Sequence, residues 1–268
     1  MKKYILDLVV RSATQPRPGY VLLQLTNPSE PLPEMQPGQF VEVRIDDAPG
    51  VFLRRPISIN LVDREANELW LLVHVVGAGT RALAQIREGA VVNVVLPLGN
   101  GFSLPESPKA GSGDGIAGRQ PRPLLIGGGI GTAPLLYLGQ RMVECGIQPV
   151  FLLGARTVDD LMQLEDFRRL GTVYITTEDG GAGERGFVTQ HSVWQQATFT
   201  SIHTCGPKPM MMAIARLARE KGIPCEVSLE NMMACGLGAC LCCVEDTKDG
   251  NVCVCTEGPV FDIEKLKW

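Results

Sequence analysis

The sequence predicts a multidomain β plus α/β protein: an antiparallel β-barrel, then a doubly wound parallel α/β domain, then a small cysteine-rich C-terminal subdomain. Three observations lead to this fold class. Short segments of alternating apolar and polar residues fill roughly the first hundred positions. After residue 122, buried strands alternate with helical segments. Six of the nine cysteines follow residue 230.

The alternating segments of the first domain are expected to be strands, because a period of two places one face of each strand against a core. Short, evenly spaced strands separated by turn residues are typical of an antiparallel barrel or sandwich. The expected strands cover residues 5–10, 20–25, 40–45, 57–60, 69–75 and 91–96, with one helical segment at 80–87.

The second domain repeats a strand-then-helix pattern, which indicates a parallel sheet covered by helices. Expected strands lie at residues 124–126, 149–153, 173–176 and 201–204, and expected helices at 133–144, 158–170, 188–196 and 209–221.

Four segments follow from these patterns: the barrel at 1–104, a linker or insertion at 105–122, the α/β domain at 123–222 and the cysteine-rich subdomain at 223–268. The linker is rich in glycine and proline, as flexible connections are. A chain of 268 residues has room for about two domains and a small appendage.

Composition excludes several classes of function. A net charge of −4 without a basic run gives no reason to expect a nucleic acid partner. No apolar run reaches the length of about 18 residues that a membrane span needs. Asp7 and Arg11 interrupt the apolar N-terminal segment, which therefore predicts a first strand and not a signal peptide. Nine cysteines without export indicate a reducing cytoplasm.

The cysteine spacing predicts a metal cluster. Cys235, Cys240 and Cys243 have the spacing C-x4-C-x2-C, and Cys255 follows further along. Four thiolates in this pattern hold the [2Fe–2S] cluster of plant-type ferredoxins. The two glycines between the first two cysteines permit positive φ and leave N–H groups free to point at sulfur. A structural zinc site and a disulfide are the alternatives, but zinc sites more often use two C-x2-C pairs, and disulfides are rare without export.

The choice among the six cysteines stays open at two positions. Cys242 neighbours Cys243, and adjacent side chains on a loop rarely both face one cluster. Cys253 and Cys255 alternate along a strand, so both would point to the same side. The expectation of Cys255 as the fourth ligand rests on its place at the entrance to the turn at residues 257–259.

Two motifs at strand ends of the barrel can bind phosphate. Arg55 and Ser58 place a guanidinium and a hydroxyl group beside Pro56, and residues 77–80 read Gly-Ala-Gly-Thr at the start of a short helix. Free N–H groups and the helix dipole favour a phosphate there. Each motif alone also fits a surface arginine or a capped turn. Together, ahead of a nucleotide-type domain, they suggest a dinucleotide such as a flavin.

Two further motifs lie in the α/β domain. Residues 127–132, Gly-Gly-Gly-Ile-Gly-Thr, join a buried strand to a helix and permit close approach of a pyrophosphate, although Thr132 breaks the register of G-x-G-x-x-G. A strand-to-helix turn that needs small residues is the alternative. Cys205-Gly206-Pro207 follows a later strand, at the edge where open α/β sheets bind ligands. A buried structural thiol is the alternative for Cys205.

With these motifs in this order, the chain resembles the ferredoxin–NADP reductase superfamily and, within it, the family of electron transfer subunits of type B (NAD-dependent) dihydroorotate dehydrogenases. The resemblance covers essentially the whole chain. The segments that carry it are 55–58, 79–80, 126–134, 205–210, 233–240 and 255–261, of which the last two are the most specific.

The resemblance implies site residues by position. The FAD contacts implied are Arg55, Pro56, Ile57, Ser58, Leu72, Val73, His74, Gly79 and Thr80. The NAD contacts implied are Gly127, Gly128, Gly129, Ile130, Gly131, Thr132, Gly206 and Pro207, with Cys205 as a catalytic residue bordering the nicotinamide. The cluster ligands implied are Cys235, Cys240, Cys243 and Cys255.

The resemblance also implies an activity and a partner. NAD+ takes up two electrons as a hydride, an iron–sulfur cluster passes one at a time, and a flavin handles both. Electrons are thus expected to pass from an FMN-containing catalytic subunit through the [2Fe–2S] cluster and FAD to NAD+, in pyrimidine (UMP) biosynthesis. A heterotetramer of two catalytic and two electron transfer subunits is implied, cytoplasmic and without a membrane or nucleic acid partner.

Two other functions stay open. One is a reductase subunit of a related flavin and iron–sulfur NAD(P)H oxidoreductase, such as a hydrogenase or a transhydrogenase. Arg156, after the second α/β strand, could meet a 2′-phosphate and favour NADP. The other is a metal-binding scaffold with structural zinc, which would be colourless and free of flavin.

Overall fold

The computed structural model describes residues 2–46, 48–104 and 121–268, so most of the expected linker lies outside the described residues. The chain forms two compact units: Met1–Gly101 together with Ser228–Lys267, and Phe102–Val227 together with Trp268. The C-terminal cysteine-rich segment therefore shares a unit with the N-terminal strands. The predicted boundaries at 104, 122 and 222 stay predictions.

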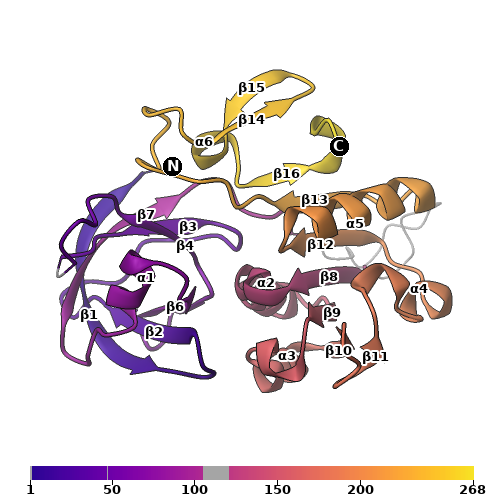
Figure 1. Ribbon diagram of the computed structural model, residues 1–268, viewed down its shortest axis with the longest axis horizontal. Coiled ribbons are helices and arrows are strands. Elements are labelled where there is room, and N and C mark those ends of the chain that lie inside the picture. Colours follow the sequence, from indigo (N-terminus) through magenta and orange to yellow (C-terminus); the bar gives the residue numbers. More distant parts are fainter. Residues whose placement is uncertain (1, 47, 105–120) are drawn as a thin grey trace. The chain divides into compact units, whose positions relative to one another are not determined.

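An antiparallel sheet of order β4-β3-β7-β1-β2-β6-β5 builds the N-terminal part of the first unit (Figure 1). Its apolar side chains alternate along each strand, and those on the inner face, such as Leu8, Leu23 and Leu71, are fully buried. The elements are β1 (Tyr4–Thr14), β2 (Tyr20–Thr26), β3 (Phe40–Val43), β4 (Arg55–Ser58), β5 (Leu61–Asp63), β6 (Glu68–His74), α1 (Ala78–Leu83) and β7 (Val91–Leu98).

The C-terminal part of the first unit is small and built around one hairpin. Val244 of β14 pairs with Cys253 of β15, and Thr247 pairs with Gly250 across the turn. The elements are β14 (Val244–Thr247), β15 (Gly250–Cys253), α6 (Val254–Glu257), β16 (Val260–Asp262) and the 3-10 helix η4 (Ile263–Lys265).

A sheet with the order β11-β10-β9-β8-β12-β13 forms the second unit. Strands β8 to β12 pair in parallel, and the chain runs outward from β8 in one direction and then from β12 in the other. The carboxyl ends of β8 and β12 are therefore a topological switch point, where α/β sheets bind ligands. The strands are β8 (Pro123–Gly128), β9 (Val150–Ala155), β10 (Thr172–Thr177), β11 (Glu184–Arg185), β12 (Ser201–Cys205) and β13 (Cys225–Ser228).

Helices connect these strands (Figure 1). Buried Leu135, Leu138 and Met142 repeat at helical spacing along α2, which packs against β8. No helix in the described ranges is both long and apolar enough to cross a membrane. The helices are η1 (Gly129–Thr132), α2 (Ala133–Glu144), η2 (Val158–Asp160), α3 (Leu164–Leu170), η3 (Val188–Gln190), α4 (Val193–Gln196) and α5 (Lys208–Lys221).

Two helices predicted as continuous are broken. Between η2 and α3, Gln163 has φ 51°, a left-handed conformation that a continuing α-helix does not contain. Between η3 and α4, His191 is extended at ψ 138°. The predictions of single helices at 158–170 and 188–196 are therefore wrong, because buried side chains at each break override the helical pattern.

Candidate functional site

The loop that carries the first three cysteines follows β13 and is held by hydrogen bonds to sulfur. The N–H of Leu237 donates to Sγ of Cys235 at 3.4 Å, and the N–H of Gly238 donates to Sγ of Cys255 at 3.1 Å. Gly236 and Gly238 have φ values of 65° and 82°. The prediction that these glycines permit positive φ and direct N–H groups at sulfur is confirmed.

The thiols of the predicted ligands interact as Cys235 with Cys240 and Cys243 with Cys255, and the thiol of Cys253 also interacts with that of Cys243. Within the described residues, no three Cys, His, Asp or Glu side chains converge as ligands of a single metal ion. A two-iron cluster needs two thiolates on each iron, which matches two pairs. A tetrahedral zinc ion needs its ligands around one point, which the pairs do not provide. The residues present fit the cluster.

The two pairs differ in electrostatic surroundings. Hydrogen bonds from the backbone, that of Leu237 first, lower the pKa of the Cys235 thiol to about 6, which favours the thiolate that binds metal. Burial and the hydrogen bond with Cys243 raise the pKa of the Cys255 thiol to about 12. Cys255 therefore needs the charge of a bound cation to lose its proton.

Residues of the N-terminal sheet support the cysteine loop from below. A methyl group on Gly236 would lie 2.9 Å from Cγ of Glu42 and 2.9 Å from Cδ1 of Leu98, so the loop rests directly on these side chains. The amide nitrogen Nδ2 of Asn100 donates to the carbonyl oxygens of Thr256 and Glu257 at 3.0 and 3.1 Å. Sequence reasoning missed Glu42 and Asn100, whose importance depends on contacts about 150 residues or more away along the chain.

Strand β4 and helix α1 bring two predicted FAD motifs together. Arg55 to Ser58 lie on an edge strand, and all four residues are half-buried. A methyl group on Gly79 would lie 2.3 Å from Nε of Arg55, so the guanidinium lies directly against this glycine and would have to shift if a side chain were added. Motifs separated by 24 positions in sequence thus share one surface, with a cation beside a helix start. This surface fits the pyrophosphate of a dinucleotide.

The other predicted FAD residues are placed less favourably for side-chain contact. Leu72 and Val73 are buried in the core, so only their backbone can face a ligand. His74 is exposed and stacks on the ring of Tyr20, with 4.5 Å between the ring centroids. The hydroxyl of Thr80 accepts hydrogen bonds from the N–H groups of Val76 and Gly77 at 3.0 Å each.

The predicted NAD motifs meet at the switch point of the second sheet. A methyl group on Gly131 would lie 2.5 Å from the backbone of Cys205 and from Cα of Gly206. One on Gly128 would lie 2.6 Å from Sδ of Met210 and 3.1 Å from Pro207. Only glycine at these positions allows the turn after β8 to pack on the end of β12.

The rest of this turn shapes an open N–H surface. Gly129 has φ 55° and starts η1, while the buried hydroxyl of Thr132 donates to the carbonyl oxygen of Gly129 at 3.0 Å. Ile130 is half-buried. Cys205 is fully buried at the end of β12. The turn leads into α2, where the N–H of Ala133 donates to the carbonyl oxygen of Ile130 and Pro134 has no N–H. A pyrophosphate at this edge would therefore meet the backbone of the glycine turn itself.

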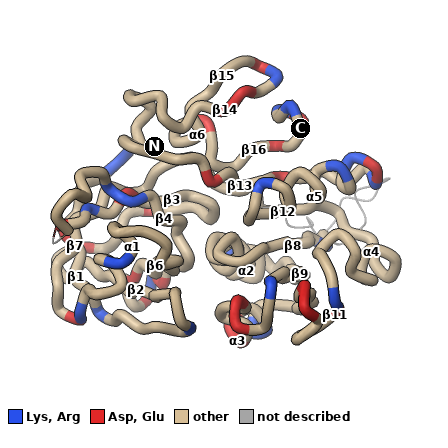
Figure 2. The backbone as a smooth tube through the Cα atoms, viewed as in Figure 1, with Lys and Arg blue, Asp and Glu red and all other residues tan. Residues whose placement is uncertain are grey.

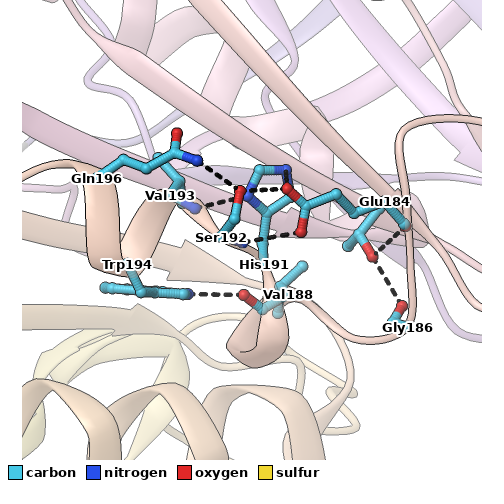
Figure 3. A network of polar contacts seen from close by, with 9 residues as sticks. Glu184, Gly186, Val188, His191, Ser192, Val193, Trp194 and Gln196 are labelled. Atoms are coloured by element: carbon cyan, nitrogen blue, oxygen red, sulfur yellow. Dashed lines mark hydrogen bonds and ion pairs between the residues drawn. The ribbon is translucent and has the colours of Figure 1, made fainter.

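A second polar cluster, near β11 and α4, has the residue types of a catalytic triad but not its connections (Figure 3). The hydroxyl of Ser192 donates to Glu184, not to His191. Nδ1 of His191 accepts the N–H of Val193 at 3.0 Å, and its Nε2 lies 3.5 Å from Glu184. The serine hydroxyl is bonded to the carboxylate and not to the imidazole, so the serine–histidine link of a catalytic triad is absent among the described residues. Glu184 and His191 accept the N–H groups of Ser192 and Val193, and the network stabilises the start of α4.

Comparison with known families and proteins adds independent evidence. Residues 230–267 match the family described as the iron–sulfur cluster binding domain of dihydroorotate dehydrogenase B. Residues 125–216 match the oxidoreductase NAD-binding domain. A protein of Shouchella clausii named dihydroorotate dehydrogenase B (NAD(+)), electron transfer subunit, is 41% identical over 235 residues, which cover 86% of each chain. A protein of the same name from Fusobacterium nucleatum is 38% identical over 231 residues, 84% of each chain.

One solved structure is similar over nearly the full length. A chain in the structure of NADH-dependent reduced ferredoxin-NADP oxidoreductase, described in connection with flavin-based electron bifurcation, has a TM-score of 0.83 and 29% identity. The match covers 98% of the present chain and 90% of the other. This similarity bears out the predicted fold class of a flavin-type β domain, an NAD-type α/β domain and a C-terminal cluster segment.

Proposed function

Because the chain belongs to the family of dihydroorotate dehydrogenase B (NAD+) electron transfer subunits, we propose that it carries electrons from a dihydroorotate-oxidising subunit to NAD+ in pyrimidine (UMP) biosynthesis. The observation that carries the proposal is the gathering of the predicted ligand cysteines in the first unit, where backbone N–H groups donate to the sulfurs of Cys235, Cys243 and Cys255. A scaffold with zinc would need one four-ligand centre in place of two pairs.

Cys235 and Cys240 would hold one iron of the cluster, and Cys243 and Cys255 the other. When bound, the cluster transfers single electrons and FAD joins them into the hydride that NAD+ accepts. The N–H groups of Leu237 and Gly238 already point at ligand sulfurs and would stabilise their negative charge.

The remaining site residues would bind and orient FAD and NAD. Arg55 would neutralise the FAD pyrophosphate beside Gly79, and Ser58 would contact the edge of the flavin ring from the same strand. The turn at 127–132 would hold the NAD pyrophosphate through its own backbone N–H groups. Cys205, buried at the end of β12, would border the nicotinamide and exclude water from it.

A partner is expected to cover the cysteine loop. Residues 231–244 contain no Lys, Arg, Asp or Glu, and beyond Glu230 the loop that leads to β14 is tan in Figure 2. Met232, Leu237 and Leu241 are exposed by 84, 49 and 64%. Exposed apolar side chains around a redox loop suit burial in a protein interface. We propose an FMN-containing catalytic subunit as the occupant, in a cytoplasmic heterotetramer of two plus two.

The test is purification of the chain from its native cells, followed by an assay of dihydroorotate-dependent NAD+ reduction. A co-purifying FMN protein, with FAD and two irons per chain of this subunit, is the expected result. NADP+ in place of NAD+ serves as the comparison substrate.

Other outcomes would separate the alternatives. If a different redox partner co-purifies and dihydroorotate gives no reduction, the pathway is wrong although the cofactors stand. Reduction of NADP+ as fast as NAD+ would favour a transhydrogenase-type reductase. A colourless protein that contains zinc would overturn the cofactors as well.

A further inference from the structure

Helix α6 determines which way Cys253 and Cys255 face. An extended segment would place both thiols on the same side, but β15 ends at Cys253 and α6 begins at Val254. Cys253 is the residue that precedes the helix, with an extended backbone at φ −83° and ψ 117°. Cys255, inside the helix, is 1% exposed, whereas Cys253 is half-buried. The expectation that both cysteines lie on one strand is therefore wrong.

The helical position of Cys255 suits a cluster ligand. Its Sγ accepts the N–H of Gly238 at 3.1 Å, and its own N–H donates to Sγ of Cys243 at 3.4 Å. Sγ of Cys253, in contrast, lies 4.0 Å from the carbonyl oxygen of Gly238. An N–H group stabilises a metal-bound thiolate, and a carbonyl oxygen does not. The helix thus separates a thiol placed for ligation from one that is not.

Helix α6 is too short to hold this arrangement by itself. It has only four residues, Val254–Glu257, and the cost of nucleation makes isolated helices of this length unstable in water. The N–H of Gly258 donates to the carbonyl oxygen of Val254 at 3.0 Å, and the hydroxyl of Thr256 donates to that of Cys253 at 3.2 Å. The last carbonyl groups of a helix have no partner within it. Their donor must come from outside.

Asn100, which follows β7, supplies that donor. Its Nδ2 donates to the carbonyl oxygens of Thr256 and Glu257 at 3.0 and 3.1 Å. Its backbone N–H donates to the carbonyl oxygen of Gly258, the residue after the helix, at 2.6 Å. One side chain of the N-terminal sheet therefore caps the C-terminal end of α6.

On the basis of the function proposed above, we propose that Asn100 is a positioning residue that caps α6 and thereby presents Cys255, and not Cys253, to the iron–sulfur cluster. Without the amide group, water would take over the two carbonyl oxygens, and water does not hold the helix against the end of β7. The segment would then return in part to extended backbone, which brings Cys253 to the same side as Cys255. The two thiols would compete for one iron.

The experiment compares Asn100→Ala and Asn100→Asp with wild type in the complete complex. Asn100→Asp keeps the size of the side chain and the backbone N–H but replaces the donating amide by an acceptor. Each protein is analysed for FAD, iron and acid-labile sulfide, for the rate of iron release to a chelator, and for the electron paramagnetic resonance spectrum of the reduced cluster. Asn251→Ala is the matched control, because Asn251 is an exposed asparagine of β15.

Both Asn100 variants should retain FAD and release iron roughly 5- to 30-fold faster than wild type, the factor expected for the loss of one or two hydrogen bonds. Their spectra should contain a second component from clusters held by Cys253. Adding Cys253→Ala to Asn100→Ala should abolish that component, whereas Cys253→Ala alone should change neither the iron content nor the spectrum. A general loss of stability would not produce this dependence on Cys253. Asn251→Ala should match wild type.

Three results would overturn the proposal. Wild-type release rates and spectra in both Asn100 variants would show that α6 needs no cap. Faster release with a single spectral component, unaffected by Cys253→Ala, would show that Asn100 does not select the ligand. Loss of FAD in both variants would make Asn100 a requirement for the whole unit and not for α6. Failure of the proposed function is recognised separately, because wild type itself would then lack iron and sulfide.

Discussion

Glu42 lies beneath the cysteine loop with both carboxyl oxygens buried and without a hydrogen-bond partner among the described residues. Its side chain is covered by Gly236 and Leu98, and the residue is 1% exposed. Burial, opposed in part by the charge of Arg54, raises the pKa of this carboxyl group from 4.5 to about 7. A buried carboxyl group without partners favours the protonated form.

Glu42→Gln is expected to remove one source of pH dependence. Below pH 4.5 the carboxyl group is protonated in both folded and unfolded chains and contributes nothing. Between pH 4.5 and about 7 the unfolded chain loses the proton first, so wild-type stability falls as pH rises. Above about pH 7 the carboxylate is charged in both states, and its burial lowers the free energy of unfolding by on the order of 3 kcal/mol. As the pH rises from 4.5 to 8, the melting temperature of Glu42→Gln should increase relative to that of wild type by roughly 5–10 °C.

The matched control for this comparison is Glu65→Gln, at an exposed position of the same unit. It should follow wild type at every pH. Parallel curves for wild type and Glu42→Gln would show that Glu42 ionises normally in the folded protein.

Arg55→Ala should weaken FAD binding without unfolding the sheet. The guanidinium lies beside Gly79 and is half-exposed, so its loss removes a charge from the proposed pyrophosphate site and little core packing. Loss of a charge-assisted contact costs about 1.5–3 kcal/mol, or roughly 10- to 150-fold in Kd. The change in Kd is measured by fluorescence titration of FAD into flavin-depleted protein. Arg11→Ala is the control, because Arg11 forms a surface ion pair with Glu68. Equal affinities for the three proteins would place the pyrophosphate elsewhere.

At the residue scale, the sequence predicts positions whose chemistry is local. The cysteine spacing and the two glycines of the loop are visible within nine residues, and the glycine geometry is confirmed. Glu42 is different. Alternation in Phe40-Val41-Glu42-Val43 predicts that Glu42 faces solvent, but a segment about 190 residues further along covers that face. No local pattern contains that information.

At the element scale, strong periodicity predicts structure and buried polar anchors override it. The predicted bounds of α2, 133–144, are confirmed, because its apolar residues repeat at helical spacing and Pro134 lies in the first turn. The segment at 188–196 has a similar helical pattern, but the helix breaks at His191, whose buried ring accepts the backbone N–H of Val193. Hydrogen bonds between side chains and the backbone compete with the hydrogen bonds of a helix, and the spacing of apolar residues does not predict them.

The junction between β8 and α2 is sensitive to the addition of a single methyl group. In Gly131→Ala the added carbon would lie 2.5 Å from backbone atoms of Cys205 and Gly206, which cannot move aside as a flexible side chain can. Overpacking of this kind costs about 1–3 kcal/mol. We expect a lower melting temperature and a raised KM for NAD+ in steady-state kinetics.

Arg169→Ala is the control for this junction, because Arg169 is an exposed residue of the same unit, on α3 and outside the turn. Its KM for NAD+ should equal that of wild type. A normal KM and melting temperature in Gly131→Ala would mean that the turn after β8 is more open than the structure shows.

At the scale of the whole molecule, the order of motifs predicts the order of functions, because the residues proposed to bind each cofactor are close in sequence or lie on neighbouring elements. The sequence does not predict that the cysteine segment joins the N-terminal unit. That association depends on contacts such as those of Asn100 with residues 256–258. Long-range contacts of this kind have no signature in a single sequence.

The proposed cluster site shares no residue with the proposed FAD and NAD sites, which predicts two separable activities. Cys240→Ala removes a proposed ligand whose exposed side chain contributes little to packing, so the fold and the FAD and NAD sites should remain. Dihydroorotate-dependent NAD+ reduction should then fall to background, since electrons must cross the cluster singly. NADH-dependent reduction of ferricyanide, which needs only FAD and the NAD site, should stay within about twofold of wild type.

Cys145→Ala is the control for this prediction, because Cys145 is a half-buried thiol of the second unit, and the variant should retain both activities. Equal loss of both activities in Cys240→Ala would show that the cluster segment is required for the fold of the flavin site, and retention of both would place the electron path outside this cluster.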